Sequence, residues 1–378
     1  MSNNEVHYCN KCVLSDQVPG IHLNEDHLCN ICRMDFVKVG KKKFSYMRRA
    51  SEAFMKHVDL DDTVCHGLFM LSGGKDSIYA LVELAQRYKT LNLKTYTLLH
   101  PYMSDAALNN INAVSAMHNY IQCFEKFPFD TYKDMFQKEF NNSNHYDFFD
   151  AHRLPCHICV CLSNISAYIY AYKMGIKYIL VCTDPEQVGT AVTSGKECLD
   201  SFVSLTSREM ADRLFGRRII DELVAEDEKN LPCFITPYVS LLDYNRDKMI
   251  LKIKDLGIYN SNTECLLSPL LYYYSISKYG VYNNINHLAN EVRRGHLDRD
   301  SVLRFLKQYN ELLSNVSIGD IPENTREQFL RVYIELFKVD TNDKELLFQL
   351  DNVLNISQVA DCYGISDRLL SDETLGSR

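Results

Sequence analysis

A glycine-rich turn that joins a short apolar run to a helix-like segment constrains this chain more than any other feature of its sequence. Residues 65–71 (CHGLFML) form the apolar run, residues 72–77 read SGGKDS, and residues 78–88 carry apolar side chains at helical spacing. A strand that turns through glycines into a helix aims free backbone N–H groups at one point, where a phosphate can bind. The turn is not a Walker loop, which needs four residues between its first glycine and its Gly-Lys pair. The sequence therefore predicts an α/β domain with a phosphate-binding loop.

The alternation of strand-like and helix-like segments continues beyond this turn. Expected strands lie at 94–99, 121–125 and 177–182, and expected helices lie at 104–119, 130–150 and 163–174. Strands that alternate with helices are typical of a parallel, doubly wound sheet. From about residue 205 the pattern becomes mostly helical. We therefore predict an N-terminal module at 1–42, an α/β domain at 43–205 and a helical region at 206–378.

Two Cys-x-x-Cys pairs define the N-terminal module. Cys9 and Cys12 form the first pair, and Cys29 and Cys32 form the second. Each pair brings two sulfurs onto one tight turn, and two such turns complete the tetrahedral four-thiolate set of a zinc ribbon. Because four protein ligands leave no open position, we expect a structural Zn²⁺ and not a catalytic one. An iron–sulfur cluster is the alternative that the same four thiolates allow.

Composition narrows the functional classes. The chain has 378 residues, a formal net charge of −8 and no long apolar run, whereas a helix that crosses a bilayer needs about 18 apolar residues. An acidic chain is not suited to coating nucleic acid, and the N-terminus shows no basic and apolar leader. We therefore expect a cytoplasmic protein without membrane or nucleic-acid partners. In a reducing compartment its 14 cysteines should be metal ligands, catalytic thiols or buried apolar residues.

Residues 72–77 resemble the SGGxDS signature of the PP-loop ATP pyrophosphatases. This resemblance implies an adenine-nucleotide α-hydrolase-like fold in which Mg²⁺-ATP is cleaved between its α and β phosphates and AMP is transferred to an oxygen of an acceptor. The two glycines let the backbone approach the phosphates without a Cβ clash, while the serine hydroxyls hydrogen-bond to phosphate oxygens. Lys75 neutralises developing charge, and Asp76 holds the magnesium. The candidate ATP-binding residues are Ser72, Gly73, Gly74, Asp76, Ser77 and Asp184.

Both ends of the chain are similar to the N-acetyl sugar amidotransferases of surface-polysaccharide biosynthesis. Residues 8–14 (YCNKCVL) and 29–33 (CNICR) resemble the opening of that family, and residues 291–299 (EVRRGHLDR) resemble its C-terminal motif. The resemblance implies that ammonia from a partner glutaminase displaces the AMP. The candidate substrate-binding residues are Arg293, Arg294 and Arg299 of this motif, and Glu186 after the fourth expected strand.

The middle of the chain departs from the sugar enzymes. That family carries an apolar-Trp-Gly-Glu-Asn string after the fourth strand, whereas residues 181–186 read VCTDPE. Cys156 and Cys159 form a further Cys-x-x-Cys pair ahead of a helix, similar to the core of two-cysteine tRNA thiolases, in which such cysteines carry a persulfide or bind an iron–sulfur cluster. A thiol can hold a persulfide and be regenerated through a disulfide with its neighbour. Cys161 and Cys123 are the other candidate thiols, and burial in the core is the alternative role for all four.

The leading hypothesis is an enzyme that adenylates a small-molecule acceptor, a nucleotide or a sugar, and replaces an acceptor oxygen by sulfur from a donor protein. The alternative is an ammonia-dependent amidotransferase that works with a separate glutaminase subunit, because no glutaminase domain is visible in the chain. A third hypothesis, a zinc-ribbon interaction protein without activity, conflicts with the intact SGGKDS turn. The sequence leaves homodimer formation open, and it does not identify the acceptor.

Overall fold

Two compact units make up the part of the chain that the structure, a computed structural model, describes. The first unit comprises Met1–Phe36, Phe140–His157 and Leu266–Arg378, and the second comprises Val37–Glu139 and Ile158–Cys265. The described residues are 6–33, 36–60, 65–100, 103–118, 120–126, 154–182, 216–227, 230–257, 281–295 and 297–315, with the single residues 265, 275 and 279.

Five parallel strands form the sheet of the second unit. They are β1 (Gly67–Met70), β2 (Leu93–Leu99), β3 (Ile121–Lys126), β4 (Tyr178–Leu180) and β5 (Cys233–Ile235). Their order is β3-β2-β1-β4-β5, and every neighbouring pair is parallel. The predicted fold class, a doubly wound parallel sheet, is thereby confirmed. β5 was not predicted, because a strand of three residues is too short to carry a recognisable periodicity.

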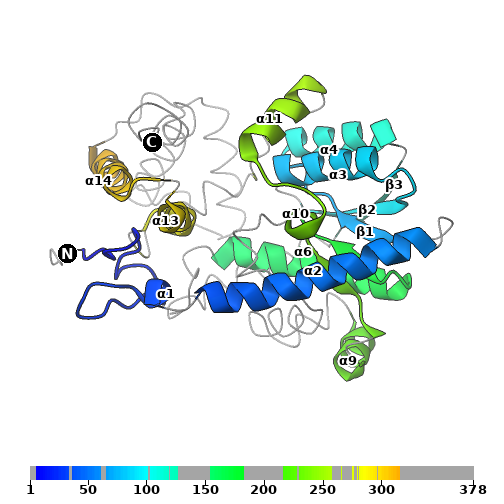
Figure 1. The fold of residues 1–378 in the computed structure, drawn as a ribbon, viewed down its shortest axis with the longest axis horizontal. Helices are drawn as coiled ribbons and strands as arrows, with labels where there is room; N and C mark the ends of the chain where they lie inside the picture. Colours follow the sequence, from blue (N-terminus) through cyan, green and yellow to red (C-terminus); the bar gives the residue numbers. More distant parts are fainter. Residues whose placement is uncertain are drawn as a thin grey trace, which may run out of the picture. The chain divides into compact units, whose positions relative to one another are not determined.

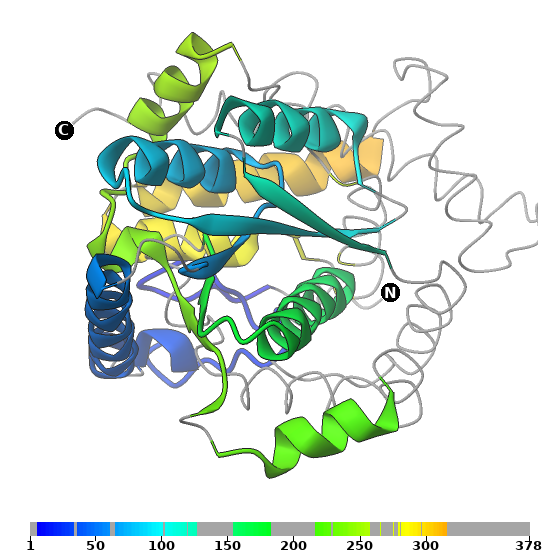
Figure 2. The same ribbon diagram turned by 90° about the vertical axis from the view of Figure 1, so that its right-hand side faces the viewer.

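Helices cover both faces of this sheet. α3 (Lys75–Arg87) and α4 (Asp105–His118) lie on one face, whereas α2 (Phe36–Leu60) and α6 (Leu154–Lys173) lie on the other, as Figure 1 and Figure 2 show. Three shorter helices follow: α9 (Arg217–Ala225), α10 (Pro237–Ser240) and α11 (Arg246–Asp255). Cover on both faces explains why the strands read as apolar runs and not as alternating ones.

The winding of the sheet reverses between β1 and β4. The chain runs outward from β1 through β2 to β3, and then returns to β4 on the other side of β1. β1 and β4 pair through Leu68 with Ile179 and Phe69 with Leu180. Ligands of doubly wound sheets bind outside the carboxyl ends of the strands at such a reversal point. The SGGKDS turn directly follows β1, so it lies at this point.

One apolar core supports the sheet, and it extends past the boundary predicted at 205. Ile78, Leu81 and Leu84 of α3 are completely buried in it. Residues from β5, α10, α11 and the link between these two helices belong to the same core, among them Ile235, Tyr238, Leu242, Met249 and Ile253. The segment that carries β5, α10 and α11 therefore packs with the sheet.

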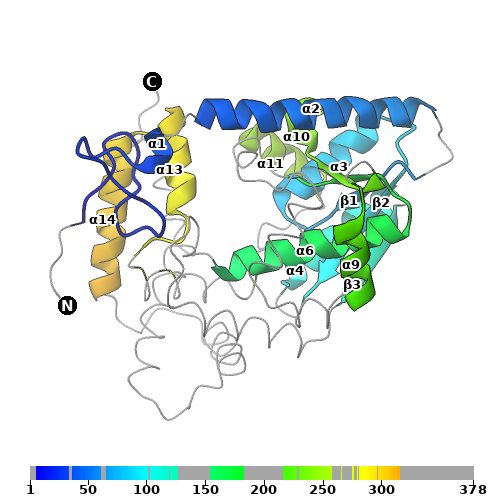
Figure 3. The same cartoon turned by 90° about the horizontal axis from the view of Figure 1, so that it is seen from below.

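The first unit combines the cysteine module with two C-terminal helices. α1 (Asn30–Arg33), α13 (Ile285–Arg294) and α14 (Arg299–Asn315) lie side by side in it, as Figure 3 shows. Gly295 ends α13 in the left-handed conformation, with a φ of 77°, which is the usual role of a glycine that follows a helix. Residues that are far apart in the sequence thus form one small body.

The remaining expectations concern segments and boundaries. The helix expected at 130–150 falls outside the described residues. Within the described part of the chain, no helix combines the length and the apolar character that crossing a bilayer requires. The domain division at 42 and 205 stays a prediction, and the sheet-containing unit of the structure continues to Cys265.

Candidate functional site

The SGGKDS turn forms a compact loop between β1 and α3. Ser72 Oγ and Ser77 Oγ lie 3.1 Å apart, and Ser77 Oγ donates to the carbonyl oxygen of Gly74 at 3.1 Å. α3 begins directly after Gly74, the N-cap residue, which has no side chain to occupy the N–H groups of the first turn. Those N–H groups and the positive end of the helix dipole favour an anion at this position. The loop therefore has the geometry of a phosphate site.

Two charged residues open the helix that follows the loop. The Lys75 ammonium donates to both carboxylate oxygens of Asp76, at 2.9 and 2.7 Å. Both side chains are partly accessible to solvent, with 26% of Lys75 and 30% of Asp76 exposed. A partly exposed carboxylate beside a phosphate site supplies the hard oxygen ligand that Mg²⁺ prefers, and Mg²⁺ usually takes few protein ligands besides phosphates. These residues therefore fit a magnesium-bound nucleotide.

Helix α4 fixes the backbone of the loop. Gly73 has a φ of +80°, and a Cβ built on it would lie only 2.4 Å from the carbonyl oxygen of Ala107. Asn110 donates from Nδ2 to the carbonyl oxygen of Gly73 at 3.0 Å and is 2% exposed. Only glycine fits this close approach in a left-handed conformation. Asn110 is not predictable from the sequence, because only its polarity on a buried helix face distinguishes it.

Tyr238 and Cys182 are two further neighbours of the loop, and no local sequence pattern marks either of them. The Tyr238 hydroxyl donates to the backbone oxygen of Asp76 at 2.5 Å. Burial raises the pKa of the Cys182 thiol well above its ordinary value, and the nearby Asp76 carboxylate adds to the rise. Burial likewise raises the pKa of Tyr238, and Cys182 contributes to that rise. Cys182 packs against the core of this unit, beside Asp76 of the loop.

The candidate thiols of the middle region lie on α6, which begins at Leu154. Cys156 and Cys159 are three residues apart, so they share one face of the helix, and both are partly exposed. Cys161 is 4% exposed and lies two positions further, which turns it away from that face. The structure therefore separates Cys161 from the pair, and a buried packing role fits it best.

Cys123, the last candidate thiol, lies within β3 and not at its carboxyl end. Its partner across the strand pair is Tyr96 of β2, and its sulfur is 3.0 Å from the hydroxyl oxygen of Tyr170 on α6. The strand continues to Lys126. A thiol that contacts a helix from the middle of a strand is placed for packing, so its catalytic assignment receives no support from this geometry.

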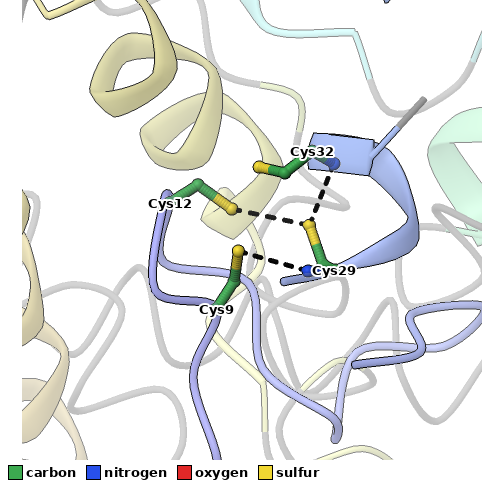
Figure 4. Close-up of side chains that lie close together, drawn as sticks. All are labelled: Cys9, Cys12, Cys29 and Cys32. Atoms are coloured by element: carbon green, nitrogen blue, oxygen red, sulfur yellow. Dashed lines mark hydrogen bonds between the residues drawn. The ribbon is translucent and has the colours of Figure 1, made fainter. Parts of the chain in front are cut away.

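The four N-terminal cysteines of the first unit come together as predicted, as Figure 4 shows. Their sulfurs all lie within 4.8 Å of one another, and the Cys12 and Cys29 sulfurs are 3.8 Å apart. A tetrahedral zinc with Zn–S bonds of about 2.3 Å puts its sulfurs about 3.8 Å apart, so the spacing fits this metal. Hydrogen bonds from Cys12 and then Cys32 lower the pKa of the Cys29 thiol. The chemistry that the metal would supply is structural, because all four positions are filled by the chain.

Backbone N–H groups complete the surroundings of these sulfurs. Lys11 and Cys29 donate to the sulfur of Cys9, at 3.4 and 3.3 Å. Leu14 donates to the sulfur of Cys12 at 3.5 Å, and Cys32 donates to the sulfur of Cys29 at 3.3 Å. Such donors stabilise thiolate charge, and thiolates are the form that binds a metal.

The three candidate arginines do not form one group. Arg299 donates from Nε and Nη2 to the carbonyl oxygens of Cys9 and Cys12, so its guanidinium is already used in the cysteine module. Arg293 donates to Asn290 one turn before it on α13. Arg294 belongs to α13, but its side chain lies outside the described residues, as do Asp184 and Glu186. The substrate-binding roles of these residues stay predictions.

Fold and site together define a class: a doubly wound α/β protein that carries a phosphate-binding loop at the reversal point of the sheet in its second unit and a four-thiol metal site in its first unit. The loop can hold a nucleotide phosphate with its magnesium, and the partly exposed thiols of α6 can take part in sulfur chemistry. The four-thiol site can stabilise structure, but it offers no position for a substrate.

Comparisons with known proteins place the chain near two solved structures. Neither a family model nor a curated protein matches the sequence. The U34-tRNA thiolase NcsA from Methanococcus maripaludis, solved with its 4Fe-4S cluster, is 16% identical over 80% of this chain and 88% of that chain, with a TM-score of 0.35. NMN synthetase from Francisella tularensis is 11% identical over 69% of this chain and 94% of that chain, with a TM-score of 0.26.

Proposed function

We propose that this chain is an ATP pyrophosphatase that adenylates a small-molecule acceptor, a nucleotide or a sugar, and then exchanges the activated oxygen for sulfur. An acceptor oxygen attacks the α phosphorus of ATP, and the bond to the β phosphate breaks with release of pyrophosphate. A sulfur nucleophile then attacks the activated carbon, and AMP leaves with the oxygen. The observation that carries the proposal is the SGGKDS loop at the carboxyl end of β1, where α3 begins.

The loop supports the first half of this reaction through backbone geometry. The two serine hydroxyls contact each other and would turn to phosphate oxygens when ATP binds. Asp76 would hold the magnesium ion, which neutralises charge on the phosphates, while Lys75 remains beside it as a second positive charge. Anchoring by Asn110 and Tyr238 keeps the two ends of the loop fixed. A fixed set of donors stabilises the developing charge without reorganisation during the reaction.

The pair formed by Cys156 and Cys159 supports the second half of the proposed reaction, the transfer of sulfur. A donor protein loads a persulfide onto one of these thiols, and the terminal sulfur attacks the activated carbon to displace AMP. The neighbouring thiol then attacks the sulfur that remains bound to the chain, which releases the thiolated product and leaves a Cys156–Cys159 disulfide. A dithiol reductant restores both thiols. Side chains three apart on a helix have Cβ atoms about 5–6 Å apart, so a small local adjustment brings them to the spacing of about 4 Å found in disulfides.

The mass of the product is the direct test. We would incubate the purified chain with Mg²⁺-ATP and candidate acceptors, supply either a persulfide donor with a dithiol reductant or ammonium, and record acceptor masses together with AMP and pyrophosphate. Exchange of oxygen for sulfur raises the acceptor mass, and exchange for nitrogen lowers it slightly. Formation of a heavier, sulfur-containing product supports the proposal. A lighter product that forms with ammonium would instead assign the amidotransferase alternative with a glutaminase partner.

Matched variants test the two halves of the proposed reaction, AMP transfer and sulfur transfer, separately. Asp76→Asn keeps the size of the side chain but removes the charge that binds magnesium, so pyrophosphate release should fall at least about 100-fold. A Cys156→Ala, Cys159→Ala double variant should lose the sulfur product. Cys161→Ala is the control on the same helix and should retain it, because this thiol is turned away from the pair. Pyrophosphate release at the parent rate from Asp76→Asn would contradict the proposal.

A further inference from the structure

The cysteine module does not fold on a core of its own. Its apolar residues share one core with α13 and α14, although about 250 residues separate the two segments in the sequence. The module contributes Val13, Leu14, Val18, Ile21 and Ile31 together with three of the four cysteines. The helices contribute Ile285, Leu288, Ala289, Val292, Val302, Phe305 and Leu306. The metal ligands are therefore built into the packing surface of the C-terminal helices.

Arg299 connects these two segments at the metal site itself. It is the first residue of α14, and its Nε donates to the carbonyl oxygens of Cys9 and Cys12, at 3.1 and 3.0 Å. Its Nη2 donates to the carbonyl oxygen of Cys9 at 2.8 Å. Both acceptor residues are ligands of the first Cys-x-x-Cys turn. One guanidinium thus spans the two ends of that turn.

Charge and hydrogen bonding make this contact specific to arginine. Four thiolates around a divalent cation leave a net charge of −2 on the site, and the guanidinium beside it stays protonated at every physiological pH. Both kinds of backbone group in the turn form hydrogen bonds. The N–H groups of Lys11 and Leu14 donate to the sulfurs of Cys9 and Cys12, and the carbonyl groups of Cys9 and Cys12 accept from Arg299. A lysine ammonium carries the same charge but lacks the planar fork that reaches two acceptors.

We propose that Arg299 is a positioning residue for the four-cysteine metal site and that metal binding stabilises α13 and α14 through it and through the shared core. Arg299 holds Cys9 and Cys12 in the conformation that binds metal, and the bound metal keeps the start of α14 in place. The metal then organises residues near both ends of the chain and not only the 28 residues around its ligands, 6–33. This inference is independent of the proposed reaction.

Zinc affinity tests the role of Arg299. Zinc-loaded full-length parent, Arg299→Gln and Arg299→Lys would be titrated with a chromogenic chelator, with Arg304→Gln as the control. Arg304 lies on the same helix, is exposed and donates to Ser301. Loss of a residue that orients metal ligands usually weakens metal binding about 10–100-fold, so we expect this for Arg299→Gln and a smaller loss for Arg299→Lys. Equal zinc affinity in Arg299→Gln and Arg304→Gln would overturn the proposal.

Hydrogen exchange on the parent protein tests the coupling without any substitution, so it remains decisive even if the Arg299 variants fold poorly. Amide exchange would be compared between zinc-loaded protein and protein stripped with the same chelator. In the stripped protein we expect faster amide exchange in α13 and α14 as well as in residues 6–33. Exchange in β1, β2 and α3 should be the same in both samples. Faster exchange confined to residues 6–33 would show that the helices do not depend on the metal, and the proposal would fall.

Discussion

Replacement of Gly73 by alanine is the sharpest test of how the phosphate loop is built. The φ of Gly73 is +80°, and a Cβ would lie 2.4 Å from the carbonyl oxygen of Ala107 and 2.9 Å from its Cα. A left-handed conformation costs a residue with a side chain about 1–2 kcal/mol, and overpacking costs about 1–3 kcal/mol more. The contacted atoms are backbone atoms of α4, so they cannot rotate away. We therefore expect Gly73→Ala to lower the free energy of unfolding by about 2–5 kcal/mol.

Two glycines of the same unit supply controls that separate conformational strain from the clash. Gly74 has a φ of −78°, and its nearest neighbour would be Ser72 Oγ at 3.5 Å, so Gly74→Ala should introduce neither cost. A glycine-to-alanine change at a compatible position stabilises by about 0.4–1 kcal/mol. Gly175 has a φ of +66° with no atom within 4 Å of a Cβ, so Gly175→Ala should show only the strain of about 1–2 kcal/mol.

Urea unfolding followed by far-ultraviolet circular dichroism measures all three variants. The expected order of stability is Gly74→Ala, then Gly175→Ala, then Gly73→Ala. Binding of a magnesium complex of a non-hydrolysable ATP analogue, measured by calorimetry, should weaken in Gly73→Ala at least about tenfold, because a displacement of about 1 Å disturbs a preorganised site. A Gly73→Ala protein as stable as Gly175→Ala would refute the close approach of the loop to α4.

Three further outcomes follow from the second unit. Glu83 is 5% exposed and pairs with Lys252 of α11. Glu83→Gln should therefore lower the free energy of unfolding, measured in urea, by about 1–3 kcal/mol. Tyr238→Phe removes the donor to Asp76 and should cost about 1–2 kcal/mol of stability together with part of the affinity for the ATP analogue, measured by calorimetry. Burial lowers the pKa of His100 to about 4 from 6.5, so the unfolded chain binds more protons than the folded chain between these values, and stability should fall as the pH drops from 6.5 towards 4. A His100→Gln protein should lose this part of the pH dependence, and an unchanged slope would contradict the assignment.

Local patterns were enough to predict the elements around the loop. The run ahead of Ser72 became β1, the helical spacing after Ser77 became α3, and the strands expected at 94–99 and 121–125 became β2 and β3. These segments have both a clear periodicity and a boundary residue. The paired Cys-x-x-Cys turns were equally readable, because the spacing of the ligands along the chain fixes their geometry.

Contacts between residues that are far apart in the sequence could not be predicted from local patterns. Tyr238 reaches the backbone of Asp76, and Arg299 reaches the backbone of Cys9. Each of these contacts depends on how whole helices and strands pack together, and the local periodicity of the sequence does not predict that packing. Arg299 shows this most clearly: a family resemblance made it a candidate substrate-binding residue, and its hydrogen bonds to the peptide carbonyl groups of the cysteine module could be seen only in the folded unit.

The contacts that hold the loop go to its backbone, and this separates the two halves of the proposed reaction. Asn110 binds the carbonyl oxygen of Gly73, and Tyr238 binds that of Asp76. Substitutions among side chains elsewhere in the site leave these contacts intact, so the chemistry of the attacking nucleophile can change while AMP transfer is preserved. A Cys156→Ala, Cys159→Ala protein should therefore still release pyrophosphate when ATP and the acceptor are supplied, within about threefold of the parent in a single turnover. If pyrophosphate release falls together with the sulfur product, the thiols contribute to adenylation, and the two halves do not act independently.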